Sequence, residues 1–375
     1  MLEVWDKQKL AKLNQIDIDD WFDVLNNGLI EDRGFSFDNP DINVIKTIIK
    51  SDYQSYLVNL VNDTNFHSYY IYRNNYDKII SVCRIVMVNS NYYLEGLETH
   101  RDFQKNGFAT KLVNGMIQLL VRDDITVLYS KVRHHNEPSN QFHTNFGFDG
   151  INSDEDNIIY KLDIENYLRK KLFDDWSSSY NESVKKSDRE NTYPFAGYSK
   201  IQQYIFDRCK DIVNANILEM GIGTGLMTSK LYGLEHKITG VDLSEKMIKK
   251  ARDLMPLNKY ILSDFNSVES KLENNGYDII IFSYSIHHMK PINQVYILDM
   301  LRDKLSERGL IIIGDVMTNT SKEMRQLSNQ FFDIWDDEEY YPTFESYLNP
   351  VLKQHYEITF NQISFCSGVM ELKKK

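Results

Sequence analysis

Three glycines at alternate positions, Gly221, Gly223 and Gly225, follow a short apolar run that contains the acid Glu219. A second apolar run ends in Asp242. Glycines let the backbone turn sharply and approach a bound ligand, and a carboxylate at the tip of a strand can accept both hydroxyls of a ribose. The pattern predicts a strand, a tight turn, a helix and a second strand that ends in a carboxylate, with a nucleoside bound at the turn.

The spacing of these glycines distinguishes two classes of nucleoside site. Dinucleotide-binding turns follow GxGxxG, with the third glycine inside the helix. This chain has ExGxGxG instead, and Leu226 and Met227 stand where that glycine would fall. The spacing therefore favours a nucleoside without phosphates, and an oxidoreductase that binds NAD at Asp242 is the alternative.

A pair of histidines follows the continuous apolar run Tyr277–Phe282, which is typical of a buried parallel strand. Such a strand would carry Ser283, His287 and His288 to its carboxyl end, where open α/β sheets place their sites. His287 or His288 could orient an acceptor or accept its proton, or the pair could be structural. Adjacent histidines on a strand or helix do not face one ion together, and no carboxylate partner is obvious, so we expect no metal site.

Several separate segments of residues 173–375, among them the glycine turn and the segment 261–265, resemble a class I S-adenosylmethionine-dependent methyltransferase. The resemblance implies that Glu219 and the glycine turn face the methionine part of S-adenosylmethionine and that Asp242 binds its ribose. It places Asp264 at the adenine amino group, although Asp264 could instead cap the helix that follows. The cofactor residues implied are Glu219, Gly221, Gly223, Gly225, Asp242, Leu243, Asp264, Phe265 and Ser283, together with Trp176 and Tyr180.

Aromatic residues are concentrated before the glycine turn, in the segments 173–180 and 193–198. Small bacterial members of the same family show similar W…Y and YPFAGY segments. The resemblance implies a lid in which Trp176, Tyr180 and Tyr198 exclude water from the transferring methyl group. Packing in the core is the alternative for these rings.

The segment Gln104–Ala109 lies between a predicted strand at 92–97 and a predicted helix at 109–121. Successive N–H groups in such a loop, added to the dipole of the helix, form an anion site suited to a pyrophosphate. Gly107 would let the backbone approach the ligand. An ordinary turn between a strand and a helix is the alternative.

A second strand and helix follow this loop, at 127–132 and 136–148, and the helix ends in Gly147-Phe148. Loop, strand and helix together resemble the GNAT acetyltransferase superfamily, in which the loop follows (Q/R)xxGx(G/A) and the helix ends in a GF dipeptide. The resemblance implies acetyl-CoA as the cofactor, with main-chain contacts for the most part. The residues implied are Leu97, Thr99, Gln104, Asn106, Gly107, Phe108, Ala109 and Asn136.

Acid and base residues are less clearly indicated in this half. The family often places a tyrosine, as general acid towards the departing thiolate, where this chain has His143. A histidine could serve because its pKa lies near neutrality, and a packed helix residue is the alternative. Glu95, Glu98 and His100 are the candidate bases for an amine acceptor. We expect Glu95 and Glu98 to face opposite ways, since they are an odd number of residues apart on one strand.

The composition excludes several classes of protein. The net charge of −11, from 43 basic and 54 acidic residues, repels phosphate backbones and anionic lipids, so we expect small-molecule acceptors and neither a nucleic-acid nor a membrane partner. The basic tail Lys373–Lys375 is predicted to be a solvated end. The acidic block Asp333–Glu339 is predicted to be a solvated loop or helix face, with steering of a cationic substrate as the alternative.

The compartment expected from the sequence is the cytosol. No apolar run approaches the roughly 20 residues that span a bilayer, and charged residues are scattered through Met1–Leu10, unlike a signal peptide. Cys83, Cys209 and Cys366 are widely separated and form no CxxC pair, so we expect reduced core residues.

The fold class predicted is α/β in two domains. Residues 1–165 are expected to form a GNAT-like mixed sheet with helices. Residues 166–375 are expected to form a Rossmann-like, seven-stranded methyltransferase sheet, whose antiparallel last strand comes from a hairpin around Asn361 and Gln362. The function predicted is a bifunctional acetyltransferase and methyltransferase. In the alternative, the N-terminal domain is a non-catalytic binding or regulatory module; the sequence does not predict the oligomeric state.

Overall fold

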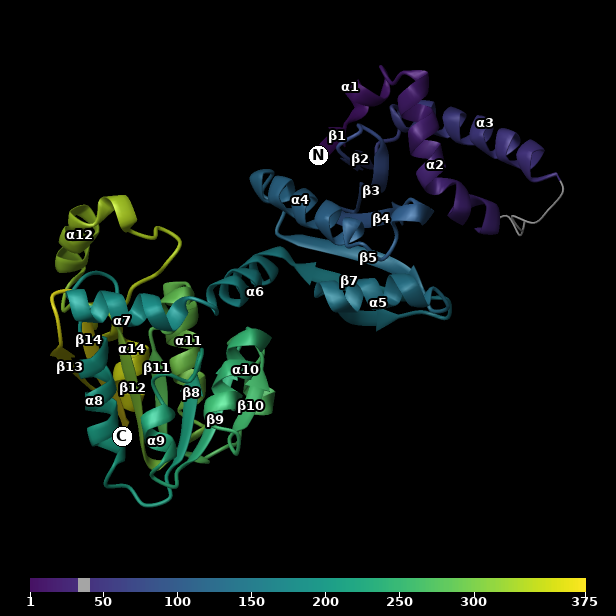
Figure 1. Ribbon diagram of the computed structural model, residues 1–375. Coiled ribbons are helices and arrows are strands. Elements are labelled where there is room, and N and C mark those ends of the chain that lie inside the picture. Colours follow the sequence, from purple (N-terminus) through teal and green to yellow (C-terminus); the bar gives the residue numbers. More distant parts are fainter. Residues whose placement is uncertain (33–40) are drawn as a thin grey trace. The chain divides into compact units, whose positions relative to one another are not determined.

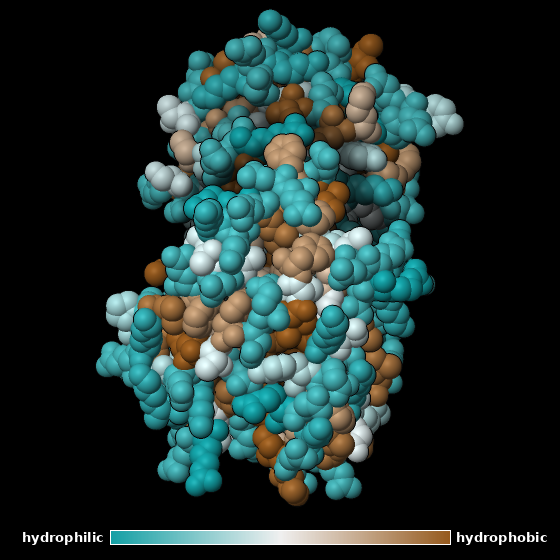
Figure 2. Space-filling view, turned by 90° about the vertical axis from the view of Figure 1, so that its left-hand side faces the viewer, coloured by the Kyte–Doolittle hydropathy of each residue, from teal (hydrophilic) through white to brown (hydrophobic). Residues whose placement is uncertain are grey.

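A computed structural model describes residues 1–32 and 41–375, except for the side chains of 26–32. The chain separates into two compact units, Met1–Leu168 and Arg169–Lys375 (Figure 1). The division lies inside helix α6 (Ile164–Trp176), the helix that also contains the boundary expected after residue 165. In the described residues, no helix is long and apolar enough to cross a membrane. The face drawn in Figure 2 is largely hydrophilic, with apolar side chains in scattered groups.

The first unit is built on a mixed sheet. In its described part, the sheet has seven strands in the order β1-β2-β3-β4-β5-β7-β6, and β4 and β5 pair in parallel while the other neighbours pair antiparallel. This arrangement confirms the predicted mixed sheet. The strands are β1 (Leu2–Trp5), β2 (Phe66–Arg73), β3 (Ile79–Val88), β4 (Asn91–Thr99), β5 (Val127–Arg133), β6 (Asp149–Ser153) and β7 (Asn157–Asp163).

Helices cover both faces of this sheet. Helix α4 (Phe108–Arg122) buries Leu112, Val113 and Met116 on one face, as its apolar spacing predicts. On the other face, Trp21 and Ile49 belong to a second apolar cluster that includes residues of β2 and β3. The remaining elements are α1 (Lys7–Leu10), α2 (Gln15–Asp32), α3 (Ile42–Leu60), the 3-10 turn η1 (Arg101–Phe103) and α5 (Glu137–Phe146).

One strand of the first unit escaped the sequence analysis. Strand β6 (Asp149–Ser153) has no apolar alternation and was not predicted. Every residue of β6 is exposed, although the strand pairs with β7. A fully exposed edge strand carries no periodic apolar signal from which it could be recognised.

The second unit, residues 169–375, contains a seven-stranded sheet in the order β10-β9-β8-β11-β12-β14-β13. Only β14 runs antiparallel to its neighbours, which confirms the predicted sheet with an antiparallel last strand. The strands are β8 (Asn216–Met220), β9 (Lys237–Asp242), β10 (Lys259–Leu262), β11 (Tyr277–Ser283), β12 (Leu305–Val316), β13 (Tyr356–Gln362) and β14 (Ser367–Lys374).

Both faces of this sheet are covered, which explains the continuous apolar character of its central strands. Along β11, Ile279 and Ile281 join one apolar cluster, while Ile280 and Phe282 join the other. The helices and turns are α7 (Tyr180–Glu190), α8 (Tyr198–Cys209), α9 (Ser229–Tyr232), α10 (Glu245–Leu254), η2 (Glu269–Lys271), η3 (Ile286–His288), α11 (Pro291–Leu301), α12 (Ser321–Gln330), η4 (Phe332–Ile334), α13 (Phe344–Tyr347) and α14 (Pro350–His355).

The turn of the last hairpin corrects one expectation. Asn361 and Gln362 lie in strand β13, and the chain reverses over residues 363–366. Ser364 closes this turn, because its hydroxyl oxygen accepts hydrogen bonds from the N–H groups of Cys366 (3.2 Å) and Ser367 (3.0 Å). A serine turn of this kind replaced the asparagine turn that the sequence analysis favoured.

Candidate cofactor sites

The glycine turn after β8 has the geometry that its spacing predicts. Gly221, Gly223 and Gly225 have φ angles of +80°, +54° and +78°, a region in which side chains are strained. A Cβ on Gly221 would lie 2.5 Å from Cβ of Ser285, and one on Gly225 would lie 2.7 Å from Cε of Met255. A Cβ on Gly223 would meet no described atom within 4 Å. The outer glycines are therefore required for packing, whereas Gly223 borders open space.

Asp242, at the end of β9, is bound to this turn. Its Oδ2 accepts a hydrogen bond from the N–H of Gly223 and its Oδ1 accepts one from the N–H of Ser244, both over 2.8 Å. Burial raises the pKa of Asp242 to about 6, although these N–H groups favour the carboxylate. The acid expected to bind a ribose thus lies directly beside the open position at Gly223.

Glu219, in β8, is almost completely enclosed, with 1% of its surface exposed. Its Oε2 accepts a hydrogen bond from the hydroxyl of Thr228 over 2.7 Å. Burial raises the pKa of Glu219 to about 8, and the charge of Asp242 acts in the same direction. Without a cationic partner, this side chain therefore holds a proton at neutral pH.

Asp264 follows β10 and is only half-buried. Its Oδ1 accepts hydrogen bonds from the N–H groups of Asn266 (2.8 Å) and Ser267 (3.1 Å), so it caps the turn that follows. The adjacent Phe265 packs edge-on against Phe282, with ring centroids 6.0 Å apart. Asp264 thus has the turn-capping contacts of the alternative, and the predicted contacts of Leu243, Asp264 and Phe265 with adenine stay predictions.

Aromatic rings gather next to the glycine turn. Trp176 and Tyr180 meet edge to face with centroids 4.9 Å apart, and Tyr180 also lies 5.9 Å from Phe195. Tyr198 is buried and stacks on Tyr284 with ring centroids 5.4 Å apart. Tyr198 is thus part of the core, which was the alternative for these rings.

Two polar contacts of the lid region were missed by the sequence analysis. Asn181, in α7, accepts a hydrogen bond from the hydroxyl of Thr224, in the glycine turn, over 2.6 Å. Asp174, in α6, accepts one from the hydroxyl of Ser244 over 2.5 Å. Neither residue was among those that the resemblance implied, and only the folded chain brings it to the site.

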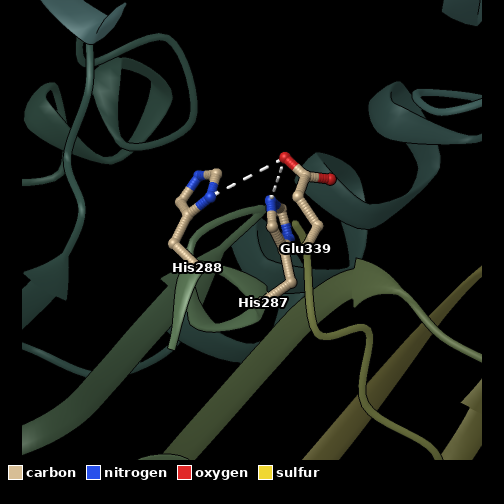
Figure 3. Close-up of side chains that lie close together, drawn as sticks. All are labelled: His287, His288 and Glu339. Carbon is tan, nitrogen blue, oxygen red and sulfur yellow. Dashed lines mark ion pairs between the residues drawn. The ribbon is translucent and has the colours of Figure 1, made fainter. Parts of the chain in front are cut away.

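The histidines after β11 differ most from expectation. The Nδ1 atom of His287 lies 2.6 Å from Oδ1 of Asp315, and its Nε2 atom lies 3.4 Å from Oε1 of Glu339. The Nδ1 atom of His288 lies 3.7 Å from the same Glu339 oxygen. Figure 3 shows the three side chains, His287, His288 and Glu339, pointing toward one another. Each residue offers one ligand atom, and these three atoms lie within 4.8 Å of one another, so the group could hold a metal ion.

This cluster corrects two expectations. The two histidines converge because they lie on the 3-10 turn η3 rather than on a regular strand or helix. The missing carboxylate partner is Glu339, which comes from the acidic block that was expected to be solvated; only 21% of its side chain is exposed. Burial alone disfavours the imidazolium, but the carboxylates of Asp315 and Glu339 raise the pKa of His287 to about 10. Despite burial, His287 in turn lowers the pKa of Glu339 to about 2.

In the first unit, the loop before α4 has the features of an anion site. Gly107 has a φ of +75°, and a Cβ there would meet no described atom within 4 Å. Helix α4 begins at Phe108, so the N–H groups of its first turn have no acceptor within the helix. The side chain of Gln104 donates to the carbonyl of Thr99 (3.2 Å) and that of Asn106 donates to the carbonyl of Gln104 (3.0 Å). These side chains hold the loop, while Gly107, Phe108 and Ala109 present main-chain groups.

Strands β4 and β5 separate next to this loop. They pair only where residues 92–94 meet 128–130, and β4 then bends at Gly96, whose φ is +56°. Leu97 and Thr99 follow the bend, and the hydroxyl of Thr99 lies 2.9 Å from that of Ser81. The two strands therefore splay apart beyond residue 94, and the contacts of Leu97 and Thr99 with acetyl-CoA stay predictions.

The same bend overturns the expectation for Glu95 and Glu98. On β3, Arg84 pairs with Glu95 and Val82 pairs with Glu98, so β4 carries one extra residue between the two pairs. Arg84 and Val82 are two residues apart and point to one face, and the two glutamates therefore do so as well. Glu95 forms an ion pair with Arg84, with Oε2 and Nη2 2.6 Å apart. His100 caps η1 by accepting a hydrogen bond from the N–H of Asp102 (3.2 Å).

His143, in α5, is packed among aromatic rings and has 2% of its surface exposed. Its Nδ1 lies 2.7 Å from the carbonyl oxygen of Ser139, its ring stacks on Tyr160 at 5.1 Å, and its buried Nε2 has no hydrogen-bond partner among the described residues. Burial lowers the pKa of His143. Asn136 caps α5 by accepting a hydrogen bond from the N–H of Ser139 (3.2 Å). These contacts are those of a packed helix residue and a helix cap.

Comparison with known proteins gives two family matches. Residues 217–309 match the model of a methyltransferase domain, and residues 38–148 match that of the acetyltransferase (GNAT) family. The N-terminal part thus matches a GNAT acetyltransferase domain and the C-terminal part a methyltransferase domain, which confirms both resemblances. The cofactors expected, acetyl-CoA and S-adenosylmethionine, agree with these matches.

Individual relatives match about half of the chain. An uncharacterized methyltransferase from Alkaliphilus oremlandii is 28% identical over 200 residues, which are 52% of this chain and 91% of the relative. Another, from Geobacillus thermodenitrificans, is 28% identical over 211 residues, 54% of this chain and 96% of the relative. Among solved structures, magnesium protoporphyrin IX methyltransferase from Synechocystis with bound SAH has 14% identity and a TM-score of 0.40, covering 55% of this chain and 100% of that one.

Proposed function

We propose that this chain is a bifunctional transferase. Its first unit would transfer an acyl group from acetyl-CoA to an amine, and its second unit would transfer a methyl group from S-adenosylmethionine to a small molecule. The observation that carries the second half is the hydrogen bond between Gly223 and Asp242, since it joins an open glycine turn to a buried carboxylate. The net charge of −11 favours small acceptors over nucleic acids.

The methyl-donor site would use the two buried acids differently. Each oxygen of Asp242 accepts one N–H, and a carboxylate oxygen can accept a second hydrogen bond from a ribose hydroxyl. Glu219 would face the amino acid end of the donor, where a positive charge would lower its raised pKa and leave a paired carboxylate. Leu243 and Phe265 would flank the adenine, and Asp264 would accept a hydrogen bond from the adenine amino group. Ser283 would line the site from the end of β11.

Methyl transfer needs mainly alignment and a dry site. S-adenosylmethionine, when bound, supplies a methyl group on a sulfonium that is already activated by charge. The chain itself would orient the acceptor in line with that methyl group and exclude water. Trp176 and Tyr180 would cover the site, because their rings pack against the apolar cluster that includes Ile222 of the glycine turn. His287 would orient the acceptor.

The acetyl-CoA site would use main-chain groups in the first unit. The N–H groups at Gly107, Phe108 and Ala109 would bind the pyrophosphate, because the start of α4 leaves them without helical acceptors. Beyond Gly96, the edge of β4 at Leu97 and Thr99 would pair with the pantetheine arm. Glu95 and Glu98 share one face of the sheet, so either could take a proton from an amine acceptor there.

A second candidate function is that the first unit binds acetyl-CoA without catalysing transfer. It is favoured by the position of His143, which is buried among rings and offers no exposed nitrogen to a departing thiolate. In that case the first unit would regulate the chain or serve as a binding module.

Calorimetric titration of the full chain with each cofactor tests the proposal. We expect one equivalent of acetyl-CoA and one of S-adenosylmethionine to bind, and Gly107→Val to weaken acetyl-CoA at least tenfold because a β-branched residue is strained at a φ of +75°. Gly150→Val, on the exposed strand β6, is the control. Failure to bind acetyl-CoA would reject the two-enzyme function.

Mass spectrometry of metabolite extracts incubated with labelled donors then separates the two candidates. The bifunctional transferase is supported by products with a labelled acetyl group and products with a labelled methyl group. The two labels can be on one molecule or on two different molecules. Acetyl-CoA that binds but yields no acetylated product, alongside methylated products, supports the non-catalytic first unit.

A further inference from the structure

The geometry points to a divalent metal site in the second unit, with His287, His288 and Glu339 as ligands and Asp315 as the residue that orients His287. The site lies at the carboxyl end of β11, where the turn η3 brings both histidines together. Its chemistry suits a first-row ion of the Zn²⁺ class. Metal binding of this kind needs neither cofactor, so it can be measured apart from the proposed transfer reactions.

Each ligand offers one atom toward a common point. Glu339 Oε1 lies 3.4 Å from His287 Nε2 and 3.7 Å from His288 Nδ1. With metal–ligand bonds of about 2.0–2.1 Å, neighbouring ligands of a tetrahedral ion lie about 3.4 Å apart. The separation of Glu339 from His287 matches a tetrahedral edge, and that from His288 is slightly longer. The two histidine nitrogens, which lie within 4.8 Å of each other, would move closer together as an ion binds.

Two of the three ligands are held by outer partners. The Nδ1 atom of His287 lies 2.6 Å from Oδ1 of the fully buried Asp315, which favours a proton on Nδ1 and leaves Nε2 for a metal. The hydroxyl of Tyr341 donates to Oε2 of Glu339 and so leaves Oε1 for the metal. Tyr341 is in turn 2.5 Å from the hydroxyl of Tyr193. Metal-ligating histidines and carboxylates are commonly oriented by such second contacts.

The loop that carries Glu339 is fixed to the histidine turn. The main-chain N–H of Tyr340 donates to the carbonyl of His287 over 2.7 Å. The buried side chain of Gln294 donates to the carbonyls of Tyr340 (2.7 Å), Met289 (2.9 Å) and Ile286 (3.2 Å). The ligands from η3 and from the distant loop are thus placed together before any ion binds, which lowers the cost of ordering the site.

The donor set selects the class of ion. Two imidazole nitrogens and one carboxylate suit zinc and its neighbours in the first row, whereas calcium and magnesium prefer oxygen ligands alone. Three protein ligands leave a fourth position for water or for an acceptor group, as in metal sites that take part in reactions. The alternative is that the cluster is an ion pair only, in which His287 is held as an imidazolium between Asp315 and Glu339.

The test is a calorimetric titration of the untagged, chelator-treated full chain with Zn²⁺, followed by metal analysis after dialysis. We expect one Zn²⁺ per chain with a micromolar or lower Kd. Glu339→Gln should weaken binding at least tenfold, while Glu338→Gln, which removes an exposed acid from the same loop, should not change it. Absence of binding, or equal binding by Glu339→Gln and the unmodified chain, would overturn the site.

Asp315→Asn supplies a second, independent measurement. It keeps all three ligands but replaces the partner of His287, so we expect zinc affinity to fall roughly 10–100-fold. Circular dichroism in the presence of chelator shows whether each variant is folded. If Asp315→Asn is folded and binds zinc as tightly as the unmodified chain, the assigned orientation of His287 is wrong.

Discussion

The main-chain N–H of Gly223 donates to Oδ2 of Asp242 over 2.8 Å, so the turn after β8 and the carboxylate that ends β9 form one structural unit. The N–H groups of Gly221 (2.8 Å) and Ile222 (2.9 Å) also reach β9, at the carbonyl of Val241. The shape of the turn therefore depends on its neighbour strand as well as on its own glycines. A ligand bound at the turn is necessarily close to Asp242.

Replacing Gly223 with arginine should abolish S-adenosylmethionine binding. The side chain would enter the open space beside Gly223, on a backbone whose φ of +54° already disfavours it. Affinity for acetyl-CoA should stay unchanged, because the two sites lie in separate units. Calorimetry with both cofactors measures this. Gly233→Arg, at an exposed glycine with open space around it, is the control, and loss of both affinities by Gly223→Arg would show that the units are not independent.

Replacing Glu219 with glutamine should stabilise the second unit and weaken its binding of S-adenosylmethionine. Burial raises the pKa of Glu219 to about 8, so the folded state holds a proton that the unfolded state releases, and stability falls as the pH rises from about 4.5 to 8. Glutamine does not titrate, and we expect a gain of roughly 2–4 kcal/mol at pH 8. The thermal transition of the second unit is the one whose midpoint S-adenosylmethionine raises. The measurement is the pH dependence of that midpoint. If the stability of Glu219→Gln depends on pH as strongly as that of the unmodified chain, the raised pKa of Glu219 is not the origin of the dependence.

Replacing His143 with phenylalanine separates packing from catalysis in the first unit. Burial lowers the pKa of His143, so the stability that its neutral ring contributes is lost as the pH falls below about 6.5. Phenylalanine should remove that dependence at a cost of about 1 kcal/mol for the lost bond to Ser139. Thermal unfolding between pH 5 and 7.5 measures it. A transfer rate at least 100-fold lower at unchanged acetyl-CoA affinity would instead assign His143 the general-acid role.

Replacing Gln294 with leucine should destabilise the second unit by about 2–4 kcal/mol, because the buried carbonyls of Ile286, Met289 and Tyr340 lose their donor. The hydroxyl of Tyr347 also loses its acceptor, Gln294 Oε1, at 2.8 Å. The measurement is the midpoint of the thermal transition of the second unit, which S-adenosylmethionine raises. Tyr296→Leu, on an exposed side of helix α11, is the matched control, and an equal effect of both variants would show that these hydrogen bonds contribute little.

The sequence by itself determined the classes of domain and most of their elements. Glycine turns, strand-end acids and helical spacing are local signals, because the conformation of Gly223 or the buried face of α4 follows from residues close by in the chain. These local signals carry the two family resemblances, and the resemblances in turn implied the mixed sheet and the antiparallel last strand. Strand β6 could not, since its exposed residues carry no periodic signal.

Only the tertiary structure decided which distant residues meet. One extra residue in β4 reverses the alternation of the strand, and this brings Glu95 and Glu98 to one face against the local rule. Strand order brings Asp315, on β12, beside His287, which follows β11, and a loop from the acidic block brings Glu339 to both histidines. Such contacts depend on strand pairing and on the closure of long loops, neither of which the spacing of residues along the chain records.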